Sequence, residues 1–193
     1  MKKRTAHAKN RGFSLVEMMV AVSLFAVVMI ISTGALLSLM DAAKKAQALQ
    51  SVMNNLNIAL DGMVRSTRMG STYHCGNIGV RTDPRDCAEG DTFFAFERYG
   101  GDSDDSSDQW VYWYDADTQR LYKSEDNGVT SFAITAPEVQ IDDMRFYVTG
   151  STVGDNAQPK IVIVVRGTAG AEKVKTRTTF SIQATAAQRL LDI

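Results

Sequence analysis

The sequence predicts an α+β protein in which one long N-terminal helix packs on an antiparallel β-sheet domain. Three observations lead to this prediction. Residues 18–40 carry no charge and no proline, residues 41–69 repeat apolar side chains at helical spacing, and residues 70–193 alternate apolar and polar side chains in short runs. The expected segments are a basic leader at 1–12, an apolar helix at 13–40, its amphipathic continuation at 41–69 and a sheet domain at 70–193.

The apolar run is a candidate membrane-spanning helix. At about 1.5 Å per residue, its 23 residues exceed the roughly 30 Å hydrocarbon core of a bilayer. Upstream lie five basic residues and no acidic residue: Lys2, Lys3, Arg4, Lys9 and Arg11. Because basic flanks stay in the cytoplasm, we expect a single pass through a membrane, with a cytoplasmic N-terminus and an extracytoplasmic sheet domain.

The charge balance separates the leader from the rest of the chain. The whole chain has 21 basic and 22 acidic residues, and five of the basic ones precede residue 13. The remainder therefore has 16 basic against 22 acidic residues. This distribution is typical of a targeting segment and gives no basic patch for a nucleic acid, so we expect no direct nucleic-acid binding.

Glu17 is the one charged residue between Gly12 and Met40. A carboxylate costs about 2.5–3.5 kcal/mol at the centre of a membrane helix, and less near the interface, so it needs a partner. If the segment were a secretory signal cut near residues 33–35, Glu17 would have no function. A cut between Gly12 and Phe13 keeps the helix and creates a new α-amino group one helical turn from Glu17. The amine of a neighbouring copy could then neutralise the carboxylate when such helices bundle.

The string RGFSLVEMMV, behind a short basic leader, resembles the N-terminal signature of the type IV pilin and type II secretion pseudopilin superfamily. The resemblance covers residues 1–40. It implies that a prepilin peptidase cuts after Gly12 and methylates the amine of Phe13, and that Glu17 serves assembly with other subunits. Secretion, pilus and DNA-uptake machines share this signature, so the machine stays open.

The proportions of the chain resemble a minor subunit. A long helix followed by a large antiparallel region is similar to the minor pseudopilin of the J type, or to minor pilins that prime filaments. The resemblance thus implies a structural subunit at or near a filament tip. An adhesin-like binding protein tethered to the membrane, and a signal-anchored enzyme, are the alternatives.

Beyond Met40 an amphipathic stripe continues the helix to about Met69. Its apolar positions are Ala42, Ala46, Leu49, Met53, Leu56, Leu60 and Met63 or Val64. Gly62 is a candidate bend. The stripe fits either filament partners or the protein's own sheet. We favour the sheet for residues 50–69, because a lone amphipathic helix is marginal in water.

Alternating segments after Gly70 predict one helix-backed domain of antiparallel strands. The expected elements are a strand at 92–99, a hairpin at 109–125 with its turn at 115–118, a turn at 126–128, and strands at 138–149, 160–167 and 173–184. In the strand at 138–149 the alternation slips at Asp142 and Asp143, which indicates a bulge or a bend.

Cys75 and Cys87 are the only cysteines. Their place in the exported part favours a disulfide, with two free thiols or half of a metal site as alternatives. His74 is the one histidine after the leader, and no CxxC is present, so zinc is disfavoured. An adjacent cysteine and histidine also make a poor catalytic pair.

An acidic loop and an aromatic cluster are the remaining candidate sites. Asp102, Asp104, Asp105 and Asp108 could hold calcium, although the segment lacks the closing glutamate of an EF-hand, and a solvated turn explains the same charges. We expect no cofactor, with calcium as the alternative. The aromatic residues between 93 and 114 fit core packing better than a ligand platform. Without GxSxG, HExxH or phosphate-binding motifs, we expect no enzyme.

Overall fold

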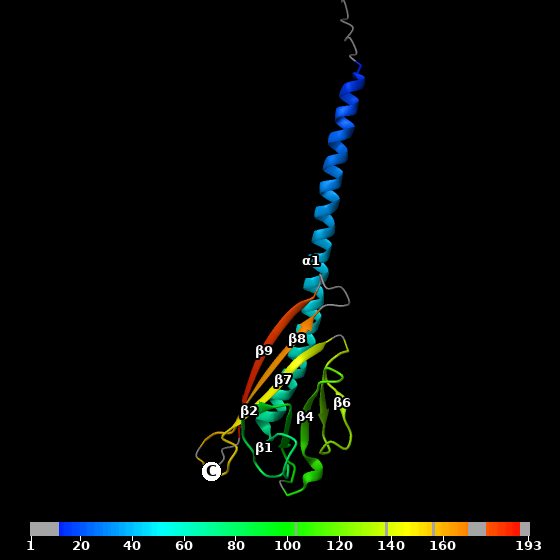
Figure 1. Ribbon diagram of the computed structural model, residues 1–193. Coiled ribbons are helices and arrows are strands. Elements are labelled where there is room, and N and C mark those ends of the chain that lie inside the picture. The colour runs from blue at the N-terminus through cyan, green and yellow to red at the C-terminus, as the bar shows by residue number, and fades with distance from the viewer. Residues whose placement is uncertain (1–11, 103, 138, 156, 170–176, 190–193) are drawn as a thin grey trace, which may run out of the picture. The chain divides into compact units, whose positions relative to one another are not determined.

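The computed structural model describes residues 12–102, 104–137, 139–155, 157–169 and 177–189 (Figure 1). The chain divides between Ala43 and Lys44 into two units, each described by itself below. The helix α1 (Leu15–Met69) contributes to both units. The elements that follow in the described residues are β1 (Ser71–Cys75), β2 (Cys87–Asp91), β3 (Phe93–Glu97), the 3₁₀ helix η1 (Ser106–Asp108), β4 (Trp110–Asp115), β5 (Arg120–Ser124), β6 (Phe132–Ala133), β7 (Gln140–Thr149), β8 (Lys160–Ala169) and β9 (Thr178–Ala187).

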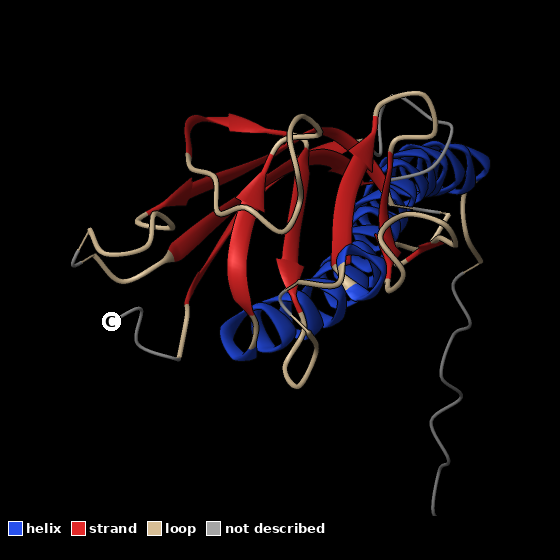
Figure 2. Cartoon of the chain, turned by 90° about the horizontal axis from the view of Figure 1, so that it is seen from below, coloured by secondary structure: helices blue, strands red, loops and turns tan. Residues whose placement is uncertain are grey.

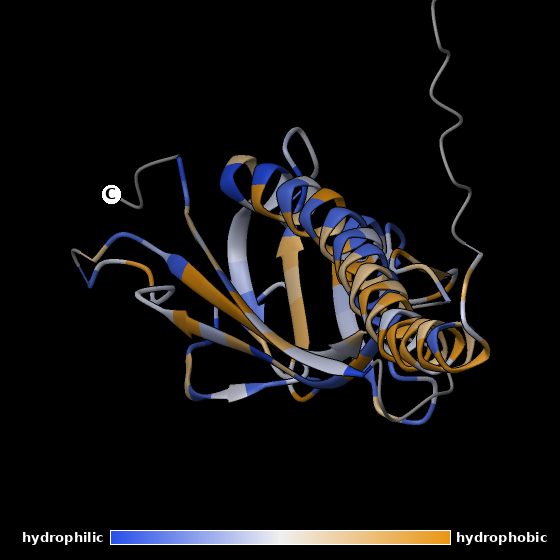
Figure 3. Cartoon of the chain, turned by 90° about the horizontal axis from the view of Figure 1, so that it is seen from above, coloured by the Kyte–Doolittle hydropathy of each residue, from blue (hydrophilic) through white to orange (hydrophobic). Residues whose placement is uncertain are grey.

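The N-terminal unit is the first part of α1. All of its described residues, 12–43, are exposed. The apolar side chains give these turns their orange colour in Figure 3. Among the described residues, α1 is the one helix whose length and composition would let it cross a membrane. A water-exposed apolar helix of this length is unfavourable, so these turns need a lipid or protein environment.

In the second unit, the C-terminal half of α1 packs on the sheets. Figure 2 shows the strands on one side of it. Its buried residues recur at three- and four-residue spacing: Val52, Leu56, Ala59, Leu60, Met63 and Thr67. Val52 packs in one hydrophobic core with Phe94 and Phe146, which confirms packing on the protein's own sheets. Within residues 50–69 the expected stripe is buried except at Met53, which is only half-buried, and Ala46 lies before this range and is exposed.

Two hydroxyl contacts fix the end of α1. The Tyr73 hydroxyl donates to the Thr67 carbonyl over 2.7 Å, and the hydroxyl groups of Ser66 and Tyr112 lie 3.0 Å apart. Burial raises the pKa of Tyr112 to about 12, and burial raises that of Tyr73 as well. Both phenols therefore stay protonated and uncharged within the core.

The expected antiparallel β-sheet domain is confirmed, and its strands form two antiparallel sheets. One sheet has the strand order β1-β3-β4-β5-β6, and the other has the order β2-β7-β8-β9. The strands of the second sheet lie side by side in Figure 1. Both contribute side chains to the core under α1. The division arises because β1 pairs with β3, whereas β2, which lies between them in the chain, pairs with β7. Such long-range pairing leaves no mark on local alternation.

The bulge predicted in β7 is confirmed. Ile141 pairs with Gly167, and Asp143 pairs with Arg166, so Asp142 is the extra residue. On its core face β7 buries Ile141, Met144, Phe146 and Val148, four of the apolar residues whose alternation was read from the sequence. The strand expected at 173–184 is present from Thr178 to Ala187, and residues 173–176 lie outside the described residues.

Candidate functional site

The predicted cleavage segment precedes the first turn of α1. Gly12, Phe13 and Ser14 are not helical, and the helix begins at Leu15. The Ser14 hydroxyl oxygen accepts the N–H of Glu17 at 3.2 Å, and the Ser14 carbonyl accepts the N–H of Met18 at 3.2 Å. Ser14 is therefore the N-cap of the helix. The sequence interpretation missed this role, although Ser followed three residues later by Glu is the spacing of a capping box.

The predicted cleavage site is open on this chain. Phe13 is 77% exposed. A Cβ placed on Gly12 would meet nothing within 4 Å. The chain itself therefore does not require glycine at this position. Any such requirement would come from the enzyme that cuts there.

Glu17 has no charged partner among the residues the structure describes. Its backbone N–H is capped by Ser14, and no hydrogen bond or ion pair to its carboxylate is present in the described part of the chain. Its position in the first turn lets it interact favourably with the positive end of the helix dipole. The dipole offsets only part of the cost of a charge in lipid.

Cys75 and Cys87 form a disulfide, with their Cα atoms 5.8 Å apart. It joins the last residue of β1 to the first residue of β2. The disulfide prediction is thus confirmed, and Cys75 has no thiol to act as a nucleophile. The neighbouring His74 is buried, and its ring nitrogens lie 2.8 and 3.1 Å from the carbonyl oxygens of Asp83 and Ile78.

The loop closed by the disulfide contacts the five-stranded sheet through Arg81. Arg81 stacks over Phe93, with 4.8 Å from the guanidinium carbon to the ring centroid. The same side chain donates to the carbonyl and side-chain oxygens of Asn127. Under this loop lies a second small core of Phe93, Ala95, Val111 and Trp113. The disulfide therefore holds the loop between Cys75 and Cys87 against part of the five-stranded sheet.

The aromatic residues form core and cross-strand contacts. Phe94 and Phe96 are fully buried and stack with ring centroids 5.4 Å apart. Tyr112 stacks on Phe96 at 6.0 Å, and Lys123 lies over the Trp110 ring at 3.6 Å. These contacts support the packing interpretation over a ligand platform.

The four aspartates of the acidic loop do not converge. Asp102 accepts the N–H of Asp104, and Asp105 accepts the N–H of Ser107, which lowers the pKa of Asp105. Asp108 instead turns toward the protein. In the described part of the chain, no group of three or more His, Cys, Asp or Glu side chains could hold a metal ion. Two of the aspartates thus stabilise local turns.

Glu97 is the titratable residue that the sequence interpretation missed. It ends β3 and is 3% exposed. Burial, helped by the charges of Asp108 and Asp102 and opposed by Arg98, raises the pKa of Glu97 to about 7. In the sequence it follows FFAF and looks like an ordinary polar residue at a strand end. Its environment comes from a loop that folds back over it.

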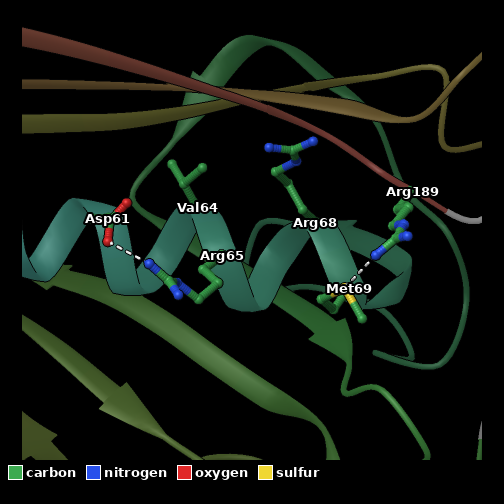
Figure 4. A pocket seen from close by; sticks show the side chains of 6 residues that line it. All are labelled: Asp61, Val64, Arg65, Arg68, Met69 and Arg189. Atoms are coloured by element: carbon green, nitrogen blue, oxygen red, sulfur yellow. Dashed lines mark hydrogen bonds and ion pairs between the residues drawn. The ribbon is translucent and has the colours of Figure 1, made fainter.

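A cavity of about 340 Å³ lies beside the C-terminal end of α1 (Figure 4). It is lined by Asp61, Val64, Arg65, Arg68, Met69 and Arg189. Arg65 forms an ion pair with Asp61 at 3.1 Å. The backbone N–H of Arg189 donates to the backbone carbonyl of Arg68 over 2.9 Å. Three guanidinium groups against one carboxylate give the cavity a positive lining.

Residues 7–33 match the family model of the prokaryotic N-terminal methylation motif. This motif is the type IV pilin and pseudopilin signal, so the resemblance read from the sequence is confirmed for this segment. No curated protein and no solved structure matched the chain. The match covers 27 of 193 residues, and the sheet domain is therefore interpreted from its own chemistry.

Proposed function

We propose that this chain, which carries the type IV pilin and pseudopilin signal, is the precursor of a minor pilin or minor pseudopilin. A prepilin peptidase removes residues 1–12 by cutting after Gly12 and methylates the amine of Phe13. Residues 13–40 hold the protein in the inner membrane, with the leader in the cytoplasm and residues 70–193 outside. The helix then joins other subunits of a type IV pilus or a type II secretion pseudopilus.

The observation that carries the proposal is the methylation motif on an exposed apolar helix. Apolar side chains from Phe13 to Met40 are exposed in the chain by itself, and burying them is worth about 25 cal/mol per Å². A bilayer covers them first. Neighbouring helices of the same kind cover them in a filament.

Glu17 supplies the alignment in this assembly. Apolar helices slide past one another at little cost, whereas a carboxylate in lipid has a strong preference for one position beside a cation. The methylated amine of Phe13 on a neighbouring subunit is that cation. The pairing would fix the axial register of each incoming subunit.

A place at or near the tip is supported by the size of the sheet domain. Residues 70–193 form two sheets with long loops rather than a single small sheet. A subunit that begins a filament has no subunit above it, so its outer domain has room for such loops.

The test is mass spectrometry of the N-terminus, on membranes with and without an active prepilin peptidase. We expect a chain that starts at methylated Phe13 when the peptidase is active, and an intact leader when it is absent. An intact Met1 in both samples, or a cut near Ala35, would contradict the proposal.

Two variants separate processing from assembly. Glu17→Ala should be cut and methylated normally but should fail to enter filaments. Gly12→Ala should be cut more efficiently than Gly12→Leu, since this chain leaves open space at Gly12 and only the peptidase subsite limits its size. Normal incorporation of Glu17→Ala would remove the role given to this residue.

A further inference from the structure

The two sheets have four edge strands in the described part of the chain: β1 and β6 in one sheet, and β2 and β9 in the other. An edge strand has backbone N–H and C=O groups without a neighbour, and it can pair with a strand of another chain. Proteins therefore shorten, bend, charge or cover their edges. Three of these four edges are protected in one of these ways, whereas β9 is not.

The three protected edges differ in their protection. The disulfide loop covers β1, because the N–H of Cys75 donates to the Arg85 carbonyl over 3.0 Å and the N–H of Arg85 donates to the Tyr73 carbonyl over 2.9 Å. The strand β6 has only two residues. The strand β2 has five residues with a register shift, and it carries the carboxylates of Glu89 and Asp91.

The strand β9 is long, regular and uncharged. Its ten residues include no proline and no glycine, and all ten pair with β8 without a register shift. It is the outermost strand of its sheet (Figure 1). Nothing in its sequence or its pairing therefore discourages a further strand.

The pairing with β8 shows which backbone groups of β9 point outward. Just past the strand, the N–H of Gln188 donates to the carbonyl of Pro159, the residue opposite. Because hydrogen-bonded pairs alternate along an antiparallel ladder, every second residue from Gln188 bonds to β8. The residues between them direct their N–H and C=O groups to the free edge, where no described residue bonds to them: Thr179, Ser181, Gln183, Thr185 and Ala187.

The core is also open along this edge. Phe180, Ile182 and Ala184 pack against the core from β9 but are only half-buried. On the neighbouring strand β8, Ile161 and Ile163 are fully buried. A further strand beside β9 would cover its apolar side chains, as β9 covers those of β8.

The C-terminal end of the open edge is positively charged. Two residues after β9, the exposed Arg189 lines the cavity of about 340 Å³ together with Arg65 and Arg68 (Figure 4). Arg65 pairs with Asp61, whereas Arg68 and Arg189 have no carboxylate partner among the described residues. A segment lying along β9 would therefore meet two unpaired cations at this end.

We propose that β9 accepts an extended segment of another protein chain as one more antiparallel strand, with an acidic side chain of that segment beside Arg68 and Arg189. The unpaired N–H and C=O groups require an extended backbone. Antiparallel addition continues the pattern of this sheet and places the N-terminal end of the segment at the C-terminal end of β9. The segment thus carries its acidic residue at its N-terminal end, followed by alternating apolar and polar side chains.

A second copy of this chain does not have the required charge. If two copies paired antiparallel through β9, the residue that directly precedes β9 in one copy would approach Arg189 of the other. That residue is Arg177. The second copy would thus bring a cation where the cavity needs a carboxylate, and like charges on neighbouring strands are destabilising.

The experiment is a binding titration of the full chain in detergent micelles with a fluorescent peptide, followed by anisotropy. The peptide has the length of β9 and consists of two aspartates followed by alternating threonine and valine, with the valine nitrogens methylated. Methylation leaves one hydrogen-bonding edge, so the peptide can pair with β9 but cannot form sheets with itself. We expect saturable binding.

Two further peptides test the mode of binding. A peptide methylated on every nitrogen should not bind, because it has no N–H to donate to β9. A peptide with the two aspartates at its C-terminal end should bind roughly 3- to 30-fold more weakly, since its charges lie away from Arg189. Hydrogen exchange should locate the contact, with slower exchange in residues 178–187 and no change in residues 87–91.

The variant Arg189→Glu should bind the original peptide roughly 3- to 30-fold more weakly. It should bind a peptide with lysines in place of the aspartates more tightly than the wild-type chain does, a gain that damage to the fold would not produce. Arg177→Glu is the matched control. It makes the same change at the other end of β9, where the Arg177 side chain contacts Gln140 at 3.4 Å, and it should leave the affinity unchanged.

Four outcomes would overturn the proposal. The first is the absence of saturable binding at millimolar peptide. The second is equal binding of the fully methylated peptide, and the third is protection from exchange outside β9. The fourth is an equal loss of affinity in Arg189→Glu and Arg177→Glu, which would show a general effect of charge.

Discussion

At the scale of single residues, Gly70 directly follows the end of α1 and lies tightly against β3. A Cβ there would lie 2.3 Å from the Phe96 ring and 2.6 Å from the Glu97 carbonyl oxygen. That carbonyl belongs to the pairing of β1 with β3, so it cannot move without disturbing the sheet. We expect Gly70→Ala to lower the free energy of unfolding by about 1–3 kcal/mol. Urea unfolding followed by tryptophan fluorescence measures this, since both tryptophans lie on β4.

Gly62→Ala is the matched control for that change. Gly62 is a helical glycine with open space around a Cβ. Alanine there should raise the free energy of unfolding by about 1 kcal/mol, because it favours the helix. Equal losses in the two variants would show that the packing at Gly70 is not the cause.

The second residue-scale prediction concerns the pH dependence that Glu97 gives to the stability of the chain. Its pKa is about 7 in the folded protein, against 4.5 for a free glutamate. Between these values the folded state holds one more proton than the unfolded state. The free energy of unfolding should therefore fall as the pH rises from about 4.5 to about 7, by at most about 1.4 kcal/mol per pH unit.

The variant Glu97→Gln isolates this contribution, since it cannot titrate and keeps the shape of the side chain. Urea midpoints at pH 5 and pH 7.5 should differ less in the variant than in the wild-type chain. An identical pH dependence in the two chains would assign it to other groups.

At the scale of elements, local patterns predict some parts of this fold and not others. The helix end at Met69 and the bulge at Asp142 follow from periodicity, because each residue is placed by its near neighbours. The strand β2 was missed, since CAEGD is polar and contains a glycine. It is a strand only because β7 lies beside it.

The same distinction applies to the candidate sites. Gly12, Phe13 and Glu17 lie within six residues, so their spacing is visible in the sequence. Glu97 and Gln109 meet through a hairpin-like return of the chain from β3 to β4, and no local pattern marks it. The matched motif likewise ends at residue 33 and says nothing about the sheets.

The disulfide is the element-scale feature whose contribution can be stated with a magnitude. It closes a loop over a sequence separation of 12 residues, which corresponds to about 3 kcal/mol of restricted unfolded-state entropy. The double variant Cys75→Ser/Cys87→Ser should lose about 2–4 kcal/mol of unfolding free energy in urea. The wild-type chain in dithiothreitol should match the variant. An unaffected midpoint under reduction would mean that the contacts of Arg81 and His74 hold the loop by themselves.

At the scale of the whole molecule, the basic leader and the cystine lie on opposite sides of the apolar span in the sequence. The five leader cations precede residue 13, and the cysteines follow residue 74. Disulfides persist outside the cytoplasm and are reduced within it. The redox state of this pair in living cells therefore reports whether the sheet domain has crossed the membrane.

We expect the Cys75–Cys87 pair to be oxidised in cells, as measured by trapping free thiols with a maleimide of high mass before electrophoresis. Changing Lys2, Lys3 and Arg4 to glutamate should increase the reduced fraction, because basic residues before the span hold that end in the cytoplasm. The matched control changes Lys44 and Lys45, which follow the span, to glutamate. This second change should leave the pair oxidised, since it removes positive charge only from the side that we propose is exported. A reduced pair in the wild-type chain, or equal effects of the two sets of changes, would contradict the proposed orientation while leaving the fold of the sheet domain unaffected.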